Sequence, residues 1–325
     1  MIQESALYRP EHRQGLSKLL RSPSKLTLIG LNLVVYYFLL RWVEANIQSE
    51  KLVDHLGQIP VWAVMGTLAI NLAALALYGV RMALLLGKGF PIGFSIINIG
   101  YTLNTLIPMR LGEPVKIYLS HRLYGTPLLE IFSASVAEKL LDLFKVLMLG
   151  LIVMAFVTSE LIQTSALFPV IALIVLGMVA YILFRLHIVR IVKILPKKSR
   201  LRRISIELHK HSGNYPVRRV LAVSLGIWIL NVAVVFFTFN TYLPGIHISI
   251  LDAAALLLIL ILAIAIPSAP AGIGLLEAGI IAFLTQKSGV GNEAALAAAA
   301  AFHLVIALPQ VLITSWLLWS RLSKH

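Results

Sequence analysis

Repeated apolar runs constrain this chain more than any other feature, because several of them reach about 18 residues or more. A helix of that length can cross the hydrocarbon core of a bilayer. Of the 325 residues, 59% are hydrophobic and only 13% are charged, whereas a soluble domain carries about 25% charged residues. The sequence therefore predicts an all-α polytopic membrane protein.

The net charge of +14 is concentrated between the apolar runs, where basic residues usually mark the cytoplasmic side of a membrane protein. Contact with anionic lipid is a second use for these residues, and nucleic acid is not expected as a partner. The chain contains no cysteine, which excludes disulfides, thiol nucleophiles and thiolate metal sites. The polar first 25 residues are too long and too mixed for the start of a cleavable signal peptide.

The distribution of basic residues predicts about six full spans, with both termini in the cytoplasm of a prokaryotic cell and the protein in its plasma membrane. The most basic stretch, 185–210, is placed inside. The expected spans are 26–43, 61–86, 127–157, 166–186, 219–241 and 293–319. The expected parts are a basic lead-in at 1–25, a membrane half at 26–186, a basic cytoplasmic linker at 187–217 and a second membrane half at 218–325.

Two further apolar stretches are interrupted by proline and glycine, and orientation constrains both. Residues 91–126 have to enter and leave on the cytoplasmic face, and residues 249–286 on the outer face. Each is expected to form a broken re-entrant helical hairpin, although two full spans would satisfy the same orientation. The two halves then form an inverted repeat, an arrangement typical of transporters that bind substrate where broken helices meet.

Charged and helix-breaking residues gather at the first break. If this tip is buried between helices, Arg110 offers a planar fork for phosphate oxygens and Lys116 adds a point charge. Glu113 or Glu138 would hold Arg110 when the site is empty. An aqueous loop is the alternative reading of the same residues. The candidate substrate-binding residues are Arg110, Lys116, Lys139 and Asn104.

Glu138, Asp142 and Lys145 share one helical face, since they are four and three residues apart. They fit either a polar face turned into the protein or a cytoplasmic first turn. The acids expected to act as charge partners or to carry a coupling proton are Glu113, Glu138, Asp142 and Glu277. His303 fits a satisfied core histidine better than a titrating one. The expected hairpin tips contain Pro108 and Gly112 in the first hairpin and Pro267, Pro270, Gly272 and Gly274 in the second. The four residues of the second tip also fit a simple kink.

These motifs resemble the flippase-like membrane domain family, also called the lysylphosphatidylglycerol synthase transmembrane region, over about residues 26 to 320. The similar elements are Pro108-Met109-Arg110-Leu111-Gly112-Glu113 with Lys116, Glu138-Lys139 with Asp142, and Pro270-Ala271-Gly272-Ile273-Gly274 with Glu277. Three positions depart from the family pattern: Lys139 replaces an Arg, Ala271 replaces a Gly, and His303 stands where a basic residue is common. The resemblance implies a stand-alone member without a synthase domain, which moves lipids between leaflets.

The leading hypothesis is therefore a flippase or scramblase for a phosphate-containing lipid, such as a phospholipid, an aminoacyl-phospholipid or a polyprenyl-linked lipid. A membrane-embedded lipid-linked transferase and a regulatory subunit of a lipid-synthesis complex are the alternatives. The expected partners are membrane lipids with anionic head groups and, in the third case, a lipid-synthesis enzyme. No cofactor or metal is expected, because no metal-ligand spacing or nucleotide-binding loop is present.

The topology can be tested with single cysteines, since the chain has none of its own. A cysteine introduced at position 199, within the basic linker, is expected to react with a membrane-impermeant maleimide only after the cells are opened. Labelling of this cysteine from outside intact cells would contradict the inverted repeat.

Overall fold

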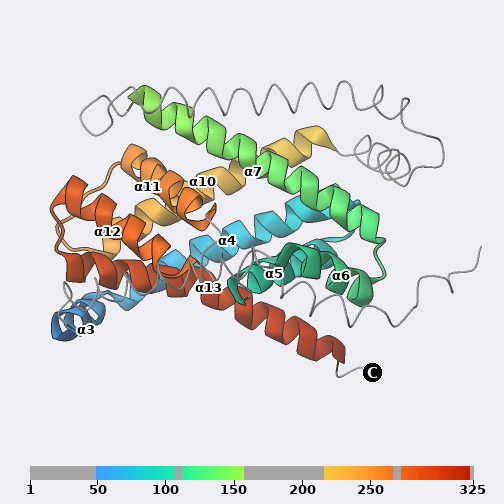
Figure 1. Ribbon diagram of the computed structural model, residues 1–325, viewed down its shortest axis with the longest axis horizontal. Helices are drawn as coiled ribbons and strands as arrows, with labels where there is room; N and C mark the ends of the chain where they lie inside the picture. The colour runs from blue at the N-terminus through green and yellow to red at the C-terminus, as the bar shows by residue number, and fades with distance from the viewer. Residues whose placement is uncertain (1–48, 107–111, 157–215, 266–271, 323–325) are drawn as a thin grey trace, which may run out of the picture. The chain divides into compact units, whose positions relative to one another are not determined.

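The computed structural model describes residues 49–106, 112–156, 216–265 and 272–322. Within these ranges the chain forms helices joined by short connections, and no strand occurs there (Figure 1). The helices are α3 (Ser49–Gln58), α4 (Val61–Leu86), α5 (Phe90–Leu106), α6 (Gly112–Tyr124), α7 (Leu128–Phe156), α10 (Val217–Tyr242), α11 (Ile250–Ala265), α12 (Leu275–Ser288) and α13 (Asn292–Leu322). The all-helical fold class is thereby confirmed for the described residues.

Several expected elements lie outside the described residues. These are the lead-in at 1–25, the spans at 26–43 and 166–186, and the basic linker at 187–217 except for its last two residues. The centres of both breaks, 107–111 and 266–271, also lie outside. The total number of spans and the division into halves consequently stay predictions.

Three of the described helices are long and apolar enough to cross a membrane: α4, α10 and Asn292–Ser320 of α13. Their mean hydropathies are 1.8, 2.5 and 2.1, yet only 28% of each apolar window is buried inside the protein. Large apolar side chains stay exposed along them, and tryptophans lie near their ends, with Trp62 on α4 and Trp316 and Trp319 on α13. Such surfaces suit lipid and its interfaces, so the chain is a multi-pass membrane protein.

Each interrupted stretch forms two short helices that pack against each other, α5 with α6 and α11 with α12. The four helices have 17, 13, 16 and 14 residues. A helix of 17 residues is about 25 Å long, which is less than the ~30 Å core of a bilayer. The pairs 90–124 and 250–288 match the expected hairpins at 91–126 and 249–286 to within two residues.

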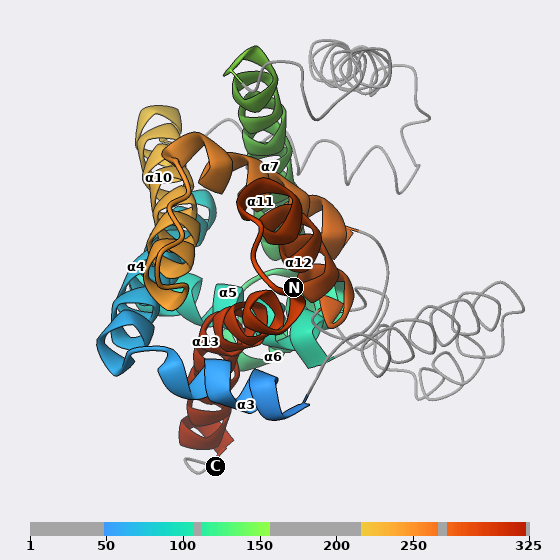
Figure 2. The same cartoon turned by 90° about the vertical axis from the view of Figure 1, so that its left-hand side faces the viewer.

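Helices from distant parts of the chain pack against each other in reciprocal pairs. The long helices α4 and α10 contact each other extensively. Helix α5 of the first hairpin packs against α13, and helix α11 of the second hairpin packs against α7 (Figures 1 and 2). Each hairpin therefore contacts a long helix from the other half of the sequence.

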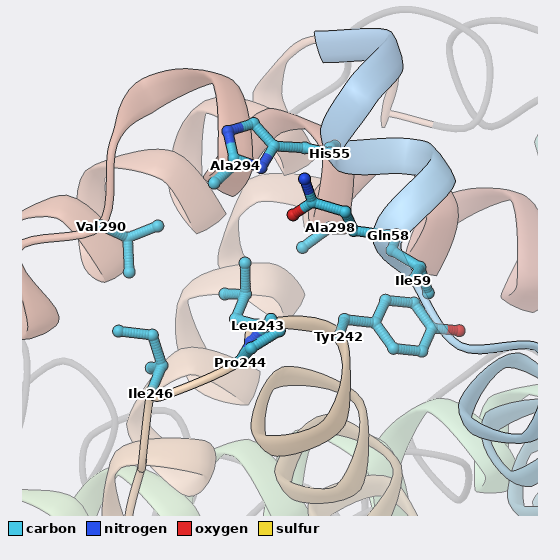
Figure 3. A pocket seen from close by; sticks show the side chains of 11 residues that line it. His55, Gln58, Ile59, Tyr242, Leu243, Pro244, Ile246, Val290, Ala294 and Ala298 are labelled. Carbon is cyan, nitrogen blue, oxygen red and sulfur yellow. The ribbon is translucent and has the colours of Figure 1, made fainter. Parts of the chain in front are cut away.

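The connection before α4 contains a helix, α3, where the sequence favours an outer loop. Leu52 and His55 are three residues apart and form the less exposed face of this helix. α3 packs against α13. Between them lies a cavity of about 240 Å³, in which His55 faces Ala294 and Ala298, with Leu243 and Ile246 on the opposite wall (Figure 3).

Two glycines allow α4 and α5 to approach closely. A Cβ atom on Gly93 would overlap the backbone nitrogen of Ala83 and lie 2.5 Å from the carbonyl oxygen of Gly79. A Cβ atom on Gly79 would lie 2.9 Å from the Cα atom of Phe94. Because these neighbours are mainly backbone, relief requires the helices to separate.

Gly93→Ala is therefore expected to destabilise the protein by about 1–3 kcal/mol. Gly57→Ala is the matched control, since its Cβ would meet nothing within 4 Å. Alanine in an exposed helical position is expected to be neutral or to stabilise by up to about 1 kcal/mol. Thermal unfolding of the detergent-solubilised protein measures both effects. Equal melting temperatures for the two variants would contradict the close approach of α4 and α5.

Candidate functional site

A cavity of about 420 Å³ lies between the two hairpins and the long helices. Residues from α4, α5, α6, α7, α10, α11, α12 and α13 line it. Its apolar lining residues, called the apolar wall below, are mainly Val234, Val235, Leu257, Leu260, Ile261, Ile264, Leu276, Phe302, Ile306 and Ala307. Its polar lining residues, called the polar wall, include Asn71, Tyr78, Tyr101, Asn104, Thr105, Glu113, Lys139, Lys145, Asn231, His303 and Gln310. Helices α10 and α13 contribute residues of both kinds. The cavity is thus amphipathic, and its size is within the usual range for ligand sites.

Within the described ranges, seven charged side chains form a connected ion cluster, and three of them, Glu113, Lys139 and Lys145, line the cavity. The ion cluster contains the cations Arg81, Lys116, Lys139 and Lys145 and the carboxylates Glu113, Glu138 and Asp142. Four cations and three carboxylates leave a net charge of +1 when all are ionised. Charges in a low-dielectric environment have to be paired, so one cation in the ion cluster is short of a counter-charge.

The first part of the ion cluster joins α6 to α7. Lys116, which is fully buried, lies with its Nζ 2.6 Å from Glu113 Oε2 and 3.5 Å from Glu138 Oε2. Lys139 is half exposed, and its Nζ lies 3.0 Å from Glu113 Oε1. The amide of Asn104 donates a hydrogen bond of 3.2 Å to the same oxygen.

Glycines make room for this arrangement. A Cβ atom on Gly100 of α5 would overlap the Lys116 side chain, so the missing side chain lets the lysine stem pass between the helices. A Cβ atom on Gly112 would lie 2.6 Å from the backbone nitrogen of Asn104. The glycine at the start of α6 therefore lets this helix begin against the end of α5, which places Glu113 beside Asn104.

Arg81 of α4 belongs to the ion cluster but does not line the cavity. The sequence suggests that Arg81 marks the cytoplasmic end of its span, but the side chain is fully buried. Its Nη1 donates a hydrogen bond of 2.9 Å to Asp142 Oδ1, and its Nη2 lies 4.0 Å from Glu138 Oε1. The guanidinium also lies 5.0 Å from the ring centre of Tyr78. The sequence feature that could have revealed this role is an arginine inside an apolar helix, five residues before the helix ends.

Lys145 forms the other end of the ion cluster and lines the cavity. Its Nζ donates a hydrogen bond of 3.4 Å to the Tyr78 hydroxyl and lies 3.7 Å from Asp142 Oδ1. The amide of Asn231 on α10 donates a hydrogen bond of 2.9 Å to the same hydroxyl. The sequence identified Lys145 as part of a polar face, but it did not indicate that Tyr78 and Asn231 would lie beside this lysine.

The second hairpin contributes an acid and a histidine. Glu277, in the first turn of α12, accepts a hydrogen bond of 2.6 Å from the backbone N–H of Gly274 and thereby caps the helix. Its other oxygen lies 2.5 Å from Nδ1 of His303. Gly272 and Gly274 both have positive φ, at 72° and 89°, a conformation that favours glycine.

The structure brings most of the expected site residues together. Asn104, Glu113, Lys139 and Gly272 line the cavity directly, and His303 links Glu277 to it. Lys116, Glu138 and Asp142 join them through the ion cluster. Arg110 and the tip prolines Pro108, Pro267 and Pro270 lie outside the described residues.

The family model for the lysylphosphatidylglycerol synthase TM region matches residues 28–314. The chain belongs to this family. The match spans the charged α6 and α7 residues and also both hairpins, so the cavity lies within the part that defines the family. A search of curated proteins finds no match to the chain.

Removal of one carboxylate tests the ion cluster. Asp142→Asn leaves the buried Arg81 without its closest partner, and this is expected to cost about 3–5 kcal/mol of stability. The double variant Arg81→Met/Asp142→Asn is expected to recover part of the loss, because the buried unpaired charge is gone. Thermal unfolding in detergent measures both.

Asp252→Asn is the control, since Asp252 pairs with the half-exposed Lys287 at 3.3 Å outside the cavity. It is expected to cost at most about 1 kcal/mol. If Asp142→Asn were no more harmful than Asp252→Asn, or if the double variant were the least stable, the ion cluster would not hold the helices together.

Proposed function

We propose that this protein is a flippase or scramblase that moves a phosphate-containing lipid between the leaflets of its membrane. The observation that supports this most directly is the amphipathic cavity. A lipid also has an apolar part and a charged part, and the apolar wall and the ion cluster match them. The head group would pass through the cavity while the acyl chains stay near the apolar wall or the bilayer.

The charge of the polar wall favours an anionic head group. The ion cluster has a net charge of +1, and Lys139, its most exposed cation, faces the cavity. A phosphate group would neutralise this excess and accept hydrogen bonds from the lysines. Helices α6 and α12 both begin next to the cavity, and their N-terminal ends also favour an anion.

The reciprocal packing of the helices supports an inverted repeat. If α4, the α5–α6 hairpin and α7 correspond to α10, the α11–α12 hairpin and α13, then the contact of α5 with α13 has its counterpart in that of α11 with α7. The contact of α6 with α7 likewise has its counterpart in that of α12 with α13. Two such halves can move against each other and open the cavity to either side.

Arg110 is proposed as an additional phosphate contact at the first hairpin tip. It lies two residues before Gly112, where α6 begins, so the chain connects it directly to the region of Glu113. An arginine presents a rigid planar fork that matches two phosphate oxygens, whereas a lysine presents a point charge. The lipid's arrival would displace a carboxylate partner, and that carboxylate could then take up a proton.

A leaflet-exchange assay tests the function. Purified protein in liposomes is expected to accelerate the exchange of a fluorescent phosphatidylglycerol, read as the fraction bleached by external dithionite. Arg110→Ala is expected to abolish exchange, Arg110→Lys to impair it, and Lys287→Gln to leave it unchanged. Exchange no faster than in empty liposomes would contradict the transport function. Full exchange by Arg110→Ala would remove only the role of Arg110, and a rate that is flat between about pH 5 and 8 would remove only proton coupling.

A further inference from the structure

We infer that Lys145, Tyr78 and Asn231 form a second anion-binding subsite in the cavity, which holds the phosphate of the head group after it leaves the region of Lys139. This inference rests on the proposed function only for the identity of the ligand as a lipid. The subsite itself follows from the charges and hydrogen bonds around Lys145.

The uncompensated charge of the ion cluster is located at Lys145. Arg81, Lys116 and Lys139 each have a carboxylate oxygen within 3.0 Å. Among the residues that the structure describes, no carboxylate oxygen lies closer to Lys145 than 3.7 Å, and that oxygen, Asp142 Oδ1, already accepts the hydrogen bond from Arg81. Lys145 is nevertheless almost fully buried, with 6% of its surface exposed. A buried ammonium with so remote a counter-charge gains more from an arriving anion than the other three cations do.

The Tyr78 hydroxyl is arranged as a donor toward the cavity. Its oxygen accepts hydrogen bonds from Asn231 and Lys145, which use both of its lone pairs. Its own proton is then left to donate, and within the described ranges no acceptor contacts it. The ring cannot turn easily, because it packs edge-on against Tyr101 with the ring centres 5.4 Å apart and lies beside Arg81.

All three side chains line the same cavity and come from α4, α7 and α10. The Lys145 ammonium and the Tyr78 hydroxyl can each donate a hydrogen bond to an oxyanion, and the Asn231 amide has a second N–H. The three groups are donors, which suits a phosphate and not a cation. Asp142 is turned toward Arg81 and does not line the cavity.

The subsite adds a second position for the head group along α7. Lys139 and Lys145 both line the cavity, and six residues of helix separate their Cα atoms by about 9 Å along the axis. The head group would move from Lys139, near the first hairpin, to Lys145, near α10. Two weaker positions would let a charged group cross without being trapped at one.

Binding of a soluble short-chain lipid tests the subsite apart from transport. Dihexanoyl-phosphatidylglycerol is titrated into the detergent-solubilised full-length protein by calorimetry, and inorganic phosphate is titrated separately. Lys145→Gln and Tyr78→Phe are each expected to raise Kd for phosphatidylglycerol roughly ten-fold, the usual effect of losing a hydrogen bond to a charged group. Because both donors contact one anion, the double variant is expected to lose less than the product of the two effects.

Matched controls are available for both substitutions. Lys287→Gln removes the same charge from a half-exposed position outside the cavity, and Tyr242→Phe removes the hydroxyl of a buried tyrosine at the smaller cavity. Both are expected to bind like the unsubstituted protein. Tyr78→Phe keeps the ring beside Arg81 and is therefore expected to fold. This variant still tests the subsite if Lys145→Gln fails to fold.

The outcomes separate the subsite from the transport function. Unchanged affinity in both Lys145→Gln and Tyr78→Phe, or no binding of either probe by the unsubstituted protein, would overturn the subsite. Loss of binding in these variants would support it, even if the liposome assay showed no exchange and the transport function failed. If inorganic phosphate binds with the same dependence on Lys145, the subsite recognises the free anion as well as the head group; if only phosphatidylglycerol does, it recognises the lipid.

Discussion

The requirement that buried charges be paired determines how α4, α6 and α7 are arranged. Arg81 and Lys116 are fully buried, and an isolated charge of this kind would cost several kcal/mol in a low-dielectric environment. The carboxylates that compensate them, Glu113, Glu138 and Asp142, come from α6 and α7. The three helices cannot separate without breaking these pairs. The ion cluster is therefore a structural connection as well as the polar wall of the cavity.

The same pairing explains why the cavity can interact with an anion without being strongly attractive everywhere. Most of the cations already contact carboxylates, so the net charge of +1 is small for seven ionised groups. A site that must release its ligand on the other side of a membrane benefits from such moderate attraction. The apolar wall, mainly from α10, α11 and α13, gives no further polar contact and suits the hydrocarbon part of a lipid.

The two hairpins bring the polar and apolar walls together. Glycine positions are essential at several places, since Gly100 leaves room for the Lys116 side chain and Gly93 for the backbone of α4. At the second hairpin, Gly272 and Gly274 adopt positive φ and allow the chain to turn into α12. Glu277 then caps that helix and contacts His303 of α13. His303 is thus a buried histidine that is paired with Glu277 at the cavity, as expected for a satisfied core residue.

The sequence by itself determined the class of the protein, the ends of the described helices other than α3 to within a few residues, and the positions at which two apolar stretches are interrupted. Hydrophobic length and helix-breaking residues are local properties, so they can be read without knowledge of the fold. The sequence also indicated Glu113, Lys116, Glu138, Lys139 and Asp142, because charges in an apolar context are conspicuous.

Only the tertiary structure decided which charges pair. The sequence offered Arg110 as the partner of Glu113; Arg110 lies outside the described residues, so this pair stays a prediction. The described contacts of Glu113 are Lys116, Lys139 and Asn104, which the sequence did not indicate as its partners. In the sequence alone, Arg81 is as consistent with a basic residue at the cytoplasmic end of a span as with a buried partner of Asp142. Tyr78 and Asn231 resemble ordinary residues of a span. Their roles depend on contacts between α4, α7 and α10, which are separated by 61 residues for Arg81 and Asp142 and by 153 for Tyr78 and Asn231. Pairing over such distances is set by helix packing, and local patterns carry no information about it.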